Sequence, residues 1–272
     1  MSFLIFSCKP LKFKDNEYEN IQKLFGEIKQ INHTTILYPL EEKDTTIIKI
    51  KSTMYFEKGN KLIKQINEYA KEDETVLFQY KKDNLFLEFS EIKGRKTKTE
   101  YFYDKNDNNI KSIKYVNDKL WSSSKIIFDK FNNKIEKSNS FTENTKDNDL
   151  EKFNIDYKNR IVKIETYDSN TKLSNNLIIR HYNKKGYLIK SEFIYLDSNK
   201  DKSMFSKFEY DSNNYLLKES QYDILGNFIG AFEYKNIYDK NGNIIEIEKK
   251  LINKNLTEKI IEKYIYKIEY LR

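Results

Sequence analysis

The sequence predicts an all-β protein, a long antiparallel meander of repeated β-hairpins forming a strongly twisted or curled sheet, with one short N-terminal helix. Two observations carry this prediction. An aromatic or large apolar residue is followed four positions later by Gly, Asn or Asp and seven positions later by Leu, Ile or Val, and these copies start 23 to 28 residues apart. The two prolines, Pro10 and Pro39, both precede the regular repeat, as a continuous ladder of N–H donors requires. A fixed period of this length indicates one supersecondary unit stacked on its neighbours.

The residue at the fourth position is expected to make the turn of each hairpin. Glycine adopts a positive φ without steric cost, and Asn and Asp tolerate it best among the other residues. An Asp or Asn usually follows the aromatic residue directly, where its side chain can accept backbone N–H bonds. Aromatic and β-branched runs on both sides read as strands. The predicted turn residues are Gly59, Asn84, Asp107, Asn132, Asn159, Gly186, Asn214, Gly226 and Gly242.

A second polar break lies between successive turns, so that each unit reads as strand, turn, strand and opposite turn. Counting these units gives about 16 to 18 strands, more than open sheets usually hold without curling or splitting. Because right-handed twist accumulates along such a sheet, we expect a curled sheet and not a flat slab. The absence of a Pro/Ser-rich linker favours a single β-repeat domain over residues 16–272.

Residues 1–15 are interpreted as a signal-peptide remnant and tether. The segment before Cys8 is apolar and resembles the end of a bacterial lipoprotein signal peptide, with Ile5 and Ser7 at the −3 and −1 positions. Cys8 is then the lipidation site, and the lipid would anchor the protein to a membrane. Alternatively, residues 2–8 could form an ordinary edge strand. No other stretch approaches the length of about 20 apolar residues that a spanning helix needs.

Residues 16–31 are the one stretch with helical spacing. Asp15 or Asn16 can cap a helix, Ile21 and Ile28 recur on one face, and Gly26 is a stop signal. We expect this helix to cover the first edge of the sheet, which needs protection against strand addition.

The composition and motifs argue against nucleic acid, cofactors and catalysis. The net charge is +7, but 42 acidic residues are interspersed with the 49 basic ones, so nucleic acid is an unfavoured partner. The two histidines, His33 and His181, are far apart in sequence, and the sequence has no phosphate-binding loop or nucleophile elbow. The run Ser122 to Ser124 reads as strand or turn residues. We therefore expect no metal, no cofactor and no enzymatic activity.

The copies that start at Tyr210, Tyr222 and Tyr238 read Tyr-Asp, then Asn or Gly at the turn. They resemble the YD repeats of RHS-type bacterial surface and toxin proteins, a resemblance that covers about four-fifths of the chain and implies a spiral wall of hairpins. A weaker similarity is to MORN-type antitoxin repeats, which also pair Tyr with Asn-Gly turns.

These observations lead to a functional hypothesis with one alternative. The leading hypothesis is a non-enzymatic lipoprotein of the bacterial cell envelope that binds a protein or glycan through an extended Tyr-rich sheet. The alternative is an immunity or antitoxin-type protein that binds a toxin in bacterial competition, which could be cytoplasmic.

Overall fold

The structure, a computed structural model, describes residues 24–40, 46–69, 73–142, 149–168, 174–196 and 200–271. These residues form 18 antiparallel strands in chain order, within the range expected from the repeat. The strands are β1 (Ile28–Leu37), β2 (Ile48–Glu57), β3 (Lys61–Glu68), β4 (Asp73–Lys81), β5 (Asn84–Ile92), β6 (Arg95–Tyr103), β7 (Asn109–Val116), β8 (Lys119–Phe128), β9 (Lys134–Phe141), β10 (Asp149–Asp156), β11 (Ile161–Asp168), β12 (Ser174–Tyr182), β13 (Leu188–Tyr195), β14 (Met204–Tyr210), β15 (Leu216–Asp223), β16 (Phe228–Tyr238), β17 (Ile244–Asn253) and β18 (Glu258–Tyr270).

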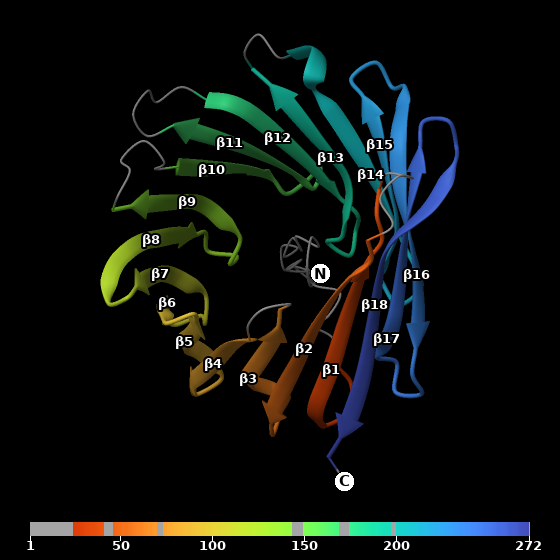
Figure 1. The fold of residues 1–272 in the computed structure, drawn as a ribbon. Helices are drawn as coiled ribbons and strands as arrows, with labels where there is room; N and C mark the ends of the chain where they lie inside the picture. Colours follow the sequence, from red (N-terminus) through yellow and green to blue (C-terminus); the bar gives the residue numbers. More distant parts are fainter. Residues whose placement is uncertain are drawn as a thin grey trace, which may run out of the picture.

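The sheet closes into a barrel. Each strand pairs with the next along the chain, and β1 pairs with both β2 and β18, so that the red and blue ends of the meander lie side by side (Figure 1). The sheet therefore curls as expected, but it closes completely, which the sequence did not predict. The twist and coiling that accumulate along the sheet bring its first and last strands together. Closure removes both unpaired edges, which would otherwise pair with strands of other molecules.

The expected N-terminal helix was also wrong where the structure describes it. Residues 24–27 are not helical, and Ile28 already belongs to β1. A β-bulge between Ile28 and Gln30 shifts the register, so Ile28 and Ile31 are both buried in the same cluster. Apolar residues three positions apart thus share a face in a strand, a spacing that a sequence alone assigns to a helix. Residues 16–23 and Cys8 lie outside the described residues.

The strand register divides the side chains between two faces. Directly opposed residues share a face, and this places two hydrophobic clusters on one face, which we call the apolar face. One cluster surrounds Ile31 and Tyr266 and the other surrounds Val162 and Ile164. The second face, which we call the charged face, carries Lys–Glu pairs such as Lys218 with Glu233 at 2.7 Å.

Much of both faces stays open to solvent. The accessible surface is 18302 Å², whereas a compact monomer of this length exposes about 12,500 Å². Large apolar side chains such as Leu77 and Phe102 are 44% and 41% exposed. The barrel is therefore held together chiefly by its strand ladders and by contacts between turns. Across the described part of the chain, no helix has the length and apolarity to cross a bilayer.

Candidate functional site

The turns of the repeat share one hydrogen-bonding pattern. In the turn that starts at Asp129, the carboxylate Oδ1 accepts bonds from the backbone N–H groups of Phe131 and Asn133 at 2.8 and 3.0 Å. Asn132 between them has a φ of 63°. The same arrangement starts at Asp104, Asn183, Asp211 and Asp239. A short acceptor followed three positions later by a residue that tolerates positive φ thus defines this turn locally.

Most of the predicted turn residues take the left-handed backbone conformation. Positive φ values occur at Gly59, Asp107, Asn132, Gly186, Asn214, Gly226 and Gly242. Asn84 and Asn159 do not follow this pattern: Asn84 begins β5, and positive φ falls instead on Lys82 in one turn and on Arg160 in the other. In these two turns the left-handed residue therefore lies at a different position from the one that the repeat spacing predicts.

The nine predicted turns do not all lie at the same end of the barrel. Turns that follow even-numbered strands lie at one end, which we call the signature rim. Gly226 lies in the connection between β15 and β16, at the opposite rim. The extra copy of the repeat at Tyr222 is thus a second use of the same local turn.

Side chains connect neighbouring turns along the signature rim. The hydroxyl of Tyr157 donates to the Asp129 carboxylate of the preceding turn, and Asn133 Nδ2 donates to the same tyrosine oxygen at 3.1 Å. Tyr238 donates to Asp211 and Tyr270 to Asp239 in the same way. At three places on this rim a tyrosine–aspartate hydrogen bond therefore joins a turn to the neighbouring hairpin.

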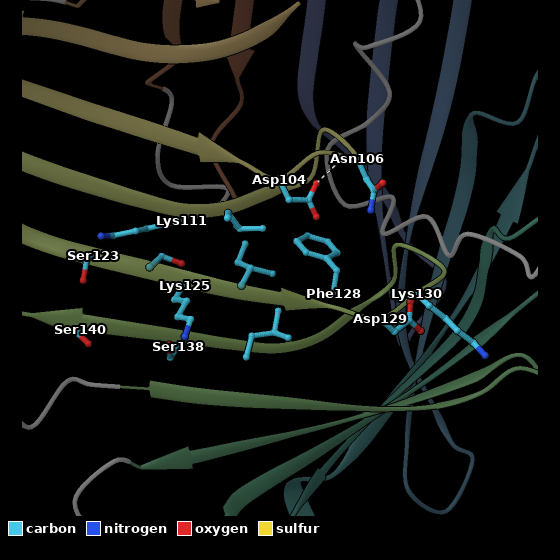
Figure 2. A pocket seen from close by; sticks show the side chains of 14 residues that line it. Asp104, Asn106, Lys111, Ser123, Lys125, Phe128, Asp129, Lys130, Ser138 and Ser140 are labelled. Atoms are coloured by element: carbon cyan, nitrogen blue, oxygen red, sulfur yellow. Dashed lines mark hydrogen bonds between the residues drawn. The ribbon is translucent and has the colours of Figure 1, made fainter.

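A groove of about 800 Å³ lies over β7, β8 and β9. Its turn end is formed by Asp104, Asn106, Asp129 and Lys130, and its apolar surface by Ile110, Ile126, Ile127 and Phe128. Polar side chains from adjacent strands complete the lining (Figure 2), namely Lys111, Ser123, Ser124, Lys125, Ser138 and Ser140. The volume falls within the usual range of about 300–1,000 Å³ for ligand sites.

The serines of the groove offer free hydroxyls. Ser123 and Ser140 are directly opposed on β8 and β9, and Ser138 is opposed to Lys125. Within the described ranges, none of these three hydroxyls has a hydrogen-bond partner in the protein, whereas Ser90 on β5 is bonded to Thr97 at 2.6 Å. The groove therefore presents hydrogen-bonding groups that a ligand can satisfy.

The two acids of the groove are occupied by the turns. Asp104 accepts bonds from Asn106 and from the backbone and side chain of Asn108, and the bond from the Asn108 side chain is the largest cause of a lowered Asp104 pKa. Asp129 accepts bonds from two backbone N–H groups and from Tyr157. A carboxylate whose oxygens already accept several hydrogen bonds from its own turn is unsuited to donating a proton to a substrate.

The two histidines lie apart. His33 on β1 stacks on Tyr266 with ring centroids 4.7 Å apart, and burial lowers its pKa. His181 on β12 bonds Glu192 on β13 at 2.8 Å. Among the described residues, no group of three or more His, Cys, Asp or Glu side chains is arranged to hold a metal ion.

Sequence reasoning missed the groove. Its serines and lysines carry no motif, and they meet only through the register of three strands. The run Ser122 to Ser124 with Ser138 and Ser140 was the available signal, because strands favour β-branched and aromatic residues.

No family model and no curated protein sequence matches this chain. Among solved structures, it is similar to a porin-like protein from Bacteroides uniformis, with a TM-score of 0.48, 9% identity, and coverage of 90% of this chain and 98% of that one. A porin-like protein from Bacteroides vulgatus has a TM-score of 0.38 and 9% identity, with coverage of 90% of this chain and 99% of that one. A putative outer membrane lipoprotein-sorting protein domain from Vibrio parahaemolyticus has a TM-score of 0.23 and 11% identity, with coverage of 90% of this chain and 85% of that one. Similarities at this level carry no argument about function.

The interpretation as an RHS-type YD-repeat protein was wrong. The hairpins close into an 18-strand barrel and do not form the spiral wall of hairpins that this resemblance implied. The Tyr-Asp pattern does not identify the fold, because it specifies only the local structure of one turn. Any antiparallel meander can use an Asx turn with a left-handed residue, and a tyrosine that bonds the neighbouring turn.

Proposed function

We propose that this chain is a non-enzymatic binding protein of the bacterial cell envelope that takes a glycan in the groove over β7–β9. The observation that carries this proposal is the pairing of unbonded hydroxyls with an apolar surface in one groove. Sugars present hydroxyl groups at their edges and C–H groups on their faces. Ser123, Ser138 and Ser140 match the first, and Phe128 and Ile127 match the second.

The chemistry of the groove supports binding without turnover. Its carboxylates at Asp104 and Asp129 are held by the turns that they stabilise. A glycosidase needs a pair of carboxylates, one of which carries a proton at working pH, and the groove lining has no other Asp or Glu. A ligand would therefore be bound and released unchanged.

Binding can be tested by screening the purified full chain against an oligosaccharide array and then by calorimetry with the best binder. Replacing the opposed pair Ser123→Val and Ser140→Val removes two hydroxyls and keeps strand propensity. We expect the double variant to weaken binding about tenfold or more, since unpaired sugar hydroxyls lose their partners.

The matched control is Ser191→Val on β13, a half-buried serine outside the groove, which should leave the affinity unchanged. Failure of every oligosaccharide to bind, or equal affinity in the wild type and the double variant, would reject the proposal.

The envelope location rests on the residues around Cys8. Expression of the full-length gene product with a palmitate analogue should label the protein, and Cys8→Ala should abolish the label. An unlabelled protein found in the cytosol would remove this part of the proposal and leave the groove untouched.

A further inference from the structure

The charged face carries a row of aromatic, cationic and hydroxyl side chains beside the serines of the groove. The register opposes Phe102 on β6 to Lys111 on β7, Lys111 to Lys125 on β8, and Lys125 to Ser138 on β9. One aromatic ring, two cations and one hydroxyl thus follow each other across four neighbouring strands. We call this set the Phe102–Ser138 row.

The two lysines at the centre of the row face each other as like charges. Directly opposed side chains have Cβ atoms about 5 Å apart, and like charges in this position are destabilising. Both lysines are exposed. Among the described residues, neither one has a carboxylate oxygen within 4.0 Å, since no ion pair includes Lys111 or Lys125.

Several other lysines of the charged face have an acidic partner. Lys98 lies 2.7 Å from Glu100, Lys218 lies 2.7 Å from Glu233, and Lys263 lies 2.8 Å from Glu246. Lys190 and Lys207 are also directly opposed, but Lys190 has Glu192 at 3.1 Å. Unlike Lys98, Lys190, Lys218 and Lys263, the two central lysines of the row therefore carry positive charges that no carboxylate of the described residues compensates.

The neighbours of the two lysines fit a sugar that carries the missing negative charge. Lys111 Nζ lies 5.5 Å from the centroid of the Phe102 ring, which holds the ammonium group near an aromatic surface that is 41% exposed. On the other side, Ser138 adds an unbonded hydroxyl. Aromatic faces accept the C–H face of a sugar, and two ammonium groups can share one anionic oxygen group through charge-assisted hydrogen bonds.

Resting on the proposed function, we infer that the glycan of this groove is acidic, and that its carboxylate or sulfate group binds between Lys111 and Lys125. Phe102 stacks on the same or the adjacent sugar ring, and Ser123, Ser138 and Ser140 bond its hydroxyls. The bound anion relieves the repulsion between the two lysines, so the ligand supplies what the sheet lacks at this position.

The test compares a uronic acid hexasaccharide with its methyl ester, and a sulfated hexasaccharide with its unsulfated parent, by calorimetry on the full chain. The ester keeps the shape of the acid and removes its charge. We expect at least one acidic probe to bind about tenfold tighter than its neutral counterpart, with a preference that declines as salt screens the exposed charges. The uronate and sulfate arms separate the two sources of the anion.

Variants assign the charge to the row. Lys125→Gln and Lys111→Gln should each reduce the acidic preference, the ratio of the affinity for the acid to the affinity for its neutral counterpart, to about threefold or less. The matched control is Lys207→Gln, which removes a cation from the other opposed lysine pair, and it should change neither affinity. Because all three lysines are at the surface, a thermal melt on each variant will show that the fold is kept.

Three outcomes would count against the inference in different ways. Equal binding of the acids and their neutral counterparts would overturn it and leave the proposed function standing. Absence of binding by every oligosaccharide would overturn both. A single-stranded oligonucleotide that binds tighter than every acidic sugar, and that loses affinity in Lys125→Gln, would reassign the row to phosphate recognition and overturn the glycan assignment.

Discussion

The turn from Asp239 to Asn243 at the signature rim and the turn from Asp223 to Asn227 at the opposite rim have the same local structure in different surroundings. In both, the aspartate Oδ1 accepts the backbone N–H of the asparagine, at 2.9 and 2.8 Å, and the glycine before the asparagine has a φ near 90°. Asn243 is 1% exposed, whereas Asn227 is exposed. The five residues make the same turn at both rims, and we expect the surrounding residues to decide how much stability each turn contributes.

The largest difference is expected for the two asparagines. Asn243 joins three segments, because it accepts from the backbone N–H of Phe25 and donates to the Phe25 carbonyl and to the Tyr270 hydroxyl. Asn243→Ala removes these three hydrogen bonds at a side chain that is 1% exposed, so we expect a loss of about 3 kcal/mol in the free energy of unfolding. Urea unfolding measures it. Asn227→Ala removes one exposed bond to Asp223 and should lose less than about 1 kcal/mol. Equal losses would mean that the two rims do not differ.

The tyrosines that precede these two turns, Tyr238 and Tyr222, should also differ in how much they stabilise the protein. Tyr238 donates a hydrogen bond to the Asp211 carboxylate of the neighbouring turn. Tyr238→Phe keeps the ring and removes this bond, which should lower the free energy of unfolding by about 2 kcal/mol because the acceptor is charged. Tyr222 holds the equivalent position at the opposite rim and has no hydroxyl bond to a described residue. Tyr222→Phe should therefore change stability by less than about 0.5 kcal/mol in the same denaturation assay, and a larger loss there would contradict the comparison.

A gain in stability is expected where the opposite rim uses an unfavourable residue. Leu256 is 72% exposed and has a φ of 61°, a conformation that costs a branched residue about 1–2 kcal/mol and that Asn tolerates better. Leu256→Asn should raise the free energy of unfolding by about 1 kcal/mol. Arg160 has a φ of 58° at the signature rim, but its Nε donates to the Tyr182 carbonyl at 3.3 Å. Arg160→Asn should gain less, and thermal melting of both variants will rank them.

The smallest effect is expected from alkaline pH on one rim contact. Burial, followed by the hydrogen bond to Asp129, raises the pKa of Tyr157 to about 12 from its usual 10.0. A raised tyrosine pKa gives stability that is complete below pH 10 and is lost as pH rises from 10 toward 12, because the unfolded chain loses its phenolic proton first. The stability difference between the wild type and Tyr157→Phe should shrink across this range in urea titrations. A constant difference would mean that the bond does not depend on the phenolic proton.

The parts of the fold that depend on one short segment could be predicted from the sequence. Positive φ at Gly186 or Gly242 follows from a local steric requirement, and the strands follow from the aromatic and β-branched runs between turns. Asn159 lies in a turn and Asn84 directly follows one, but the same spacing accommodates turns whose left-handed residue is Lys82 or Arg160. Closure could not be predicted, because it depends on the pairing of β1 with β18, which lie at opposite ends of the described chain. The start of β1 was predicted as a helix because the bulge near Ile28 gives its apolar residues a helical spacing.

The candidate site was beyond sequence reasoning for the same physical reason. Lys111 and Lys125 are 14 positions apart, and Phe102 and Ser138 lie on two further strands. Only the register shows that the four side chains form one row. A shift of one residue in any of these pairings would send a side chain to the other face.

The pairing of β1 with β18 also constrains how the protein is made. β18 is synthesised after the other strands described here, so a nascent chain on the ribosome carries two unpaired sheet edges until its last segment emerges. Contacts between segments more than 200 residues apart form slowly, because a long loop must close first. Loss of β18 through premature termination would therefore leave a product with two adhesive edges, and we expect such a product to aggregate or to be degraded.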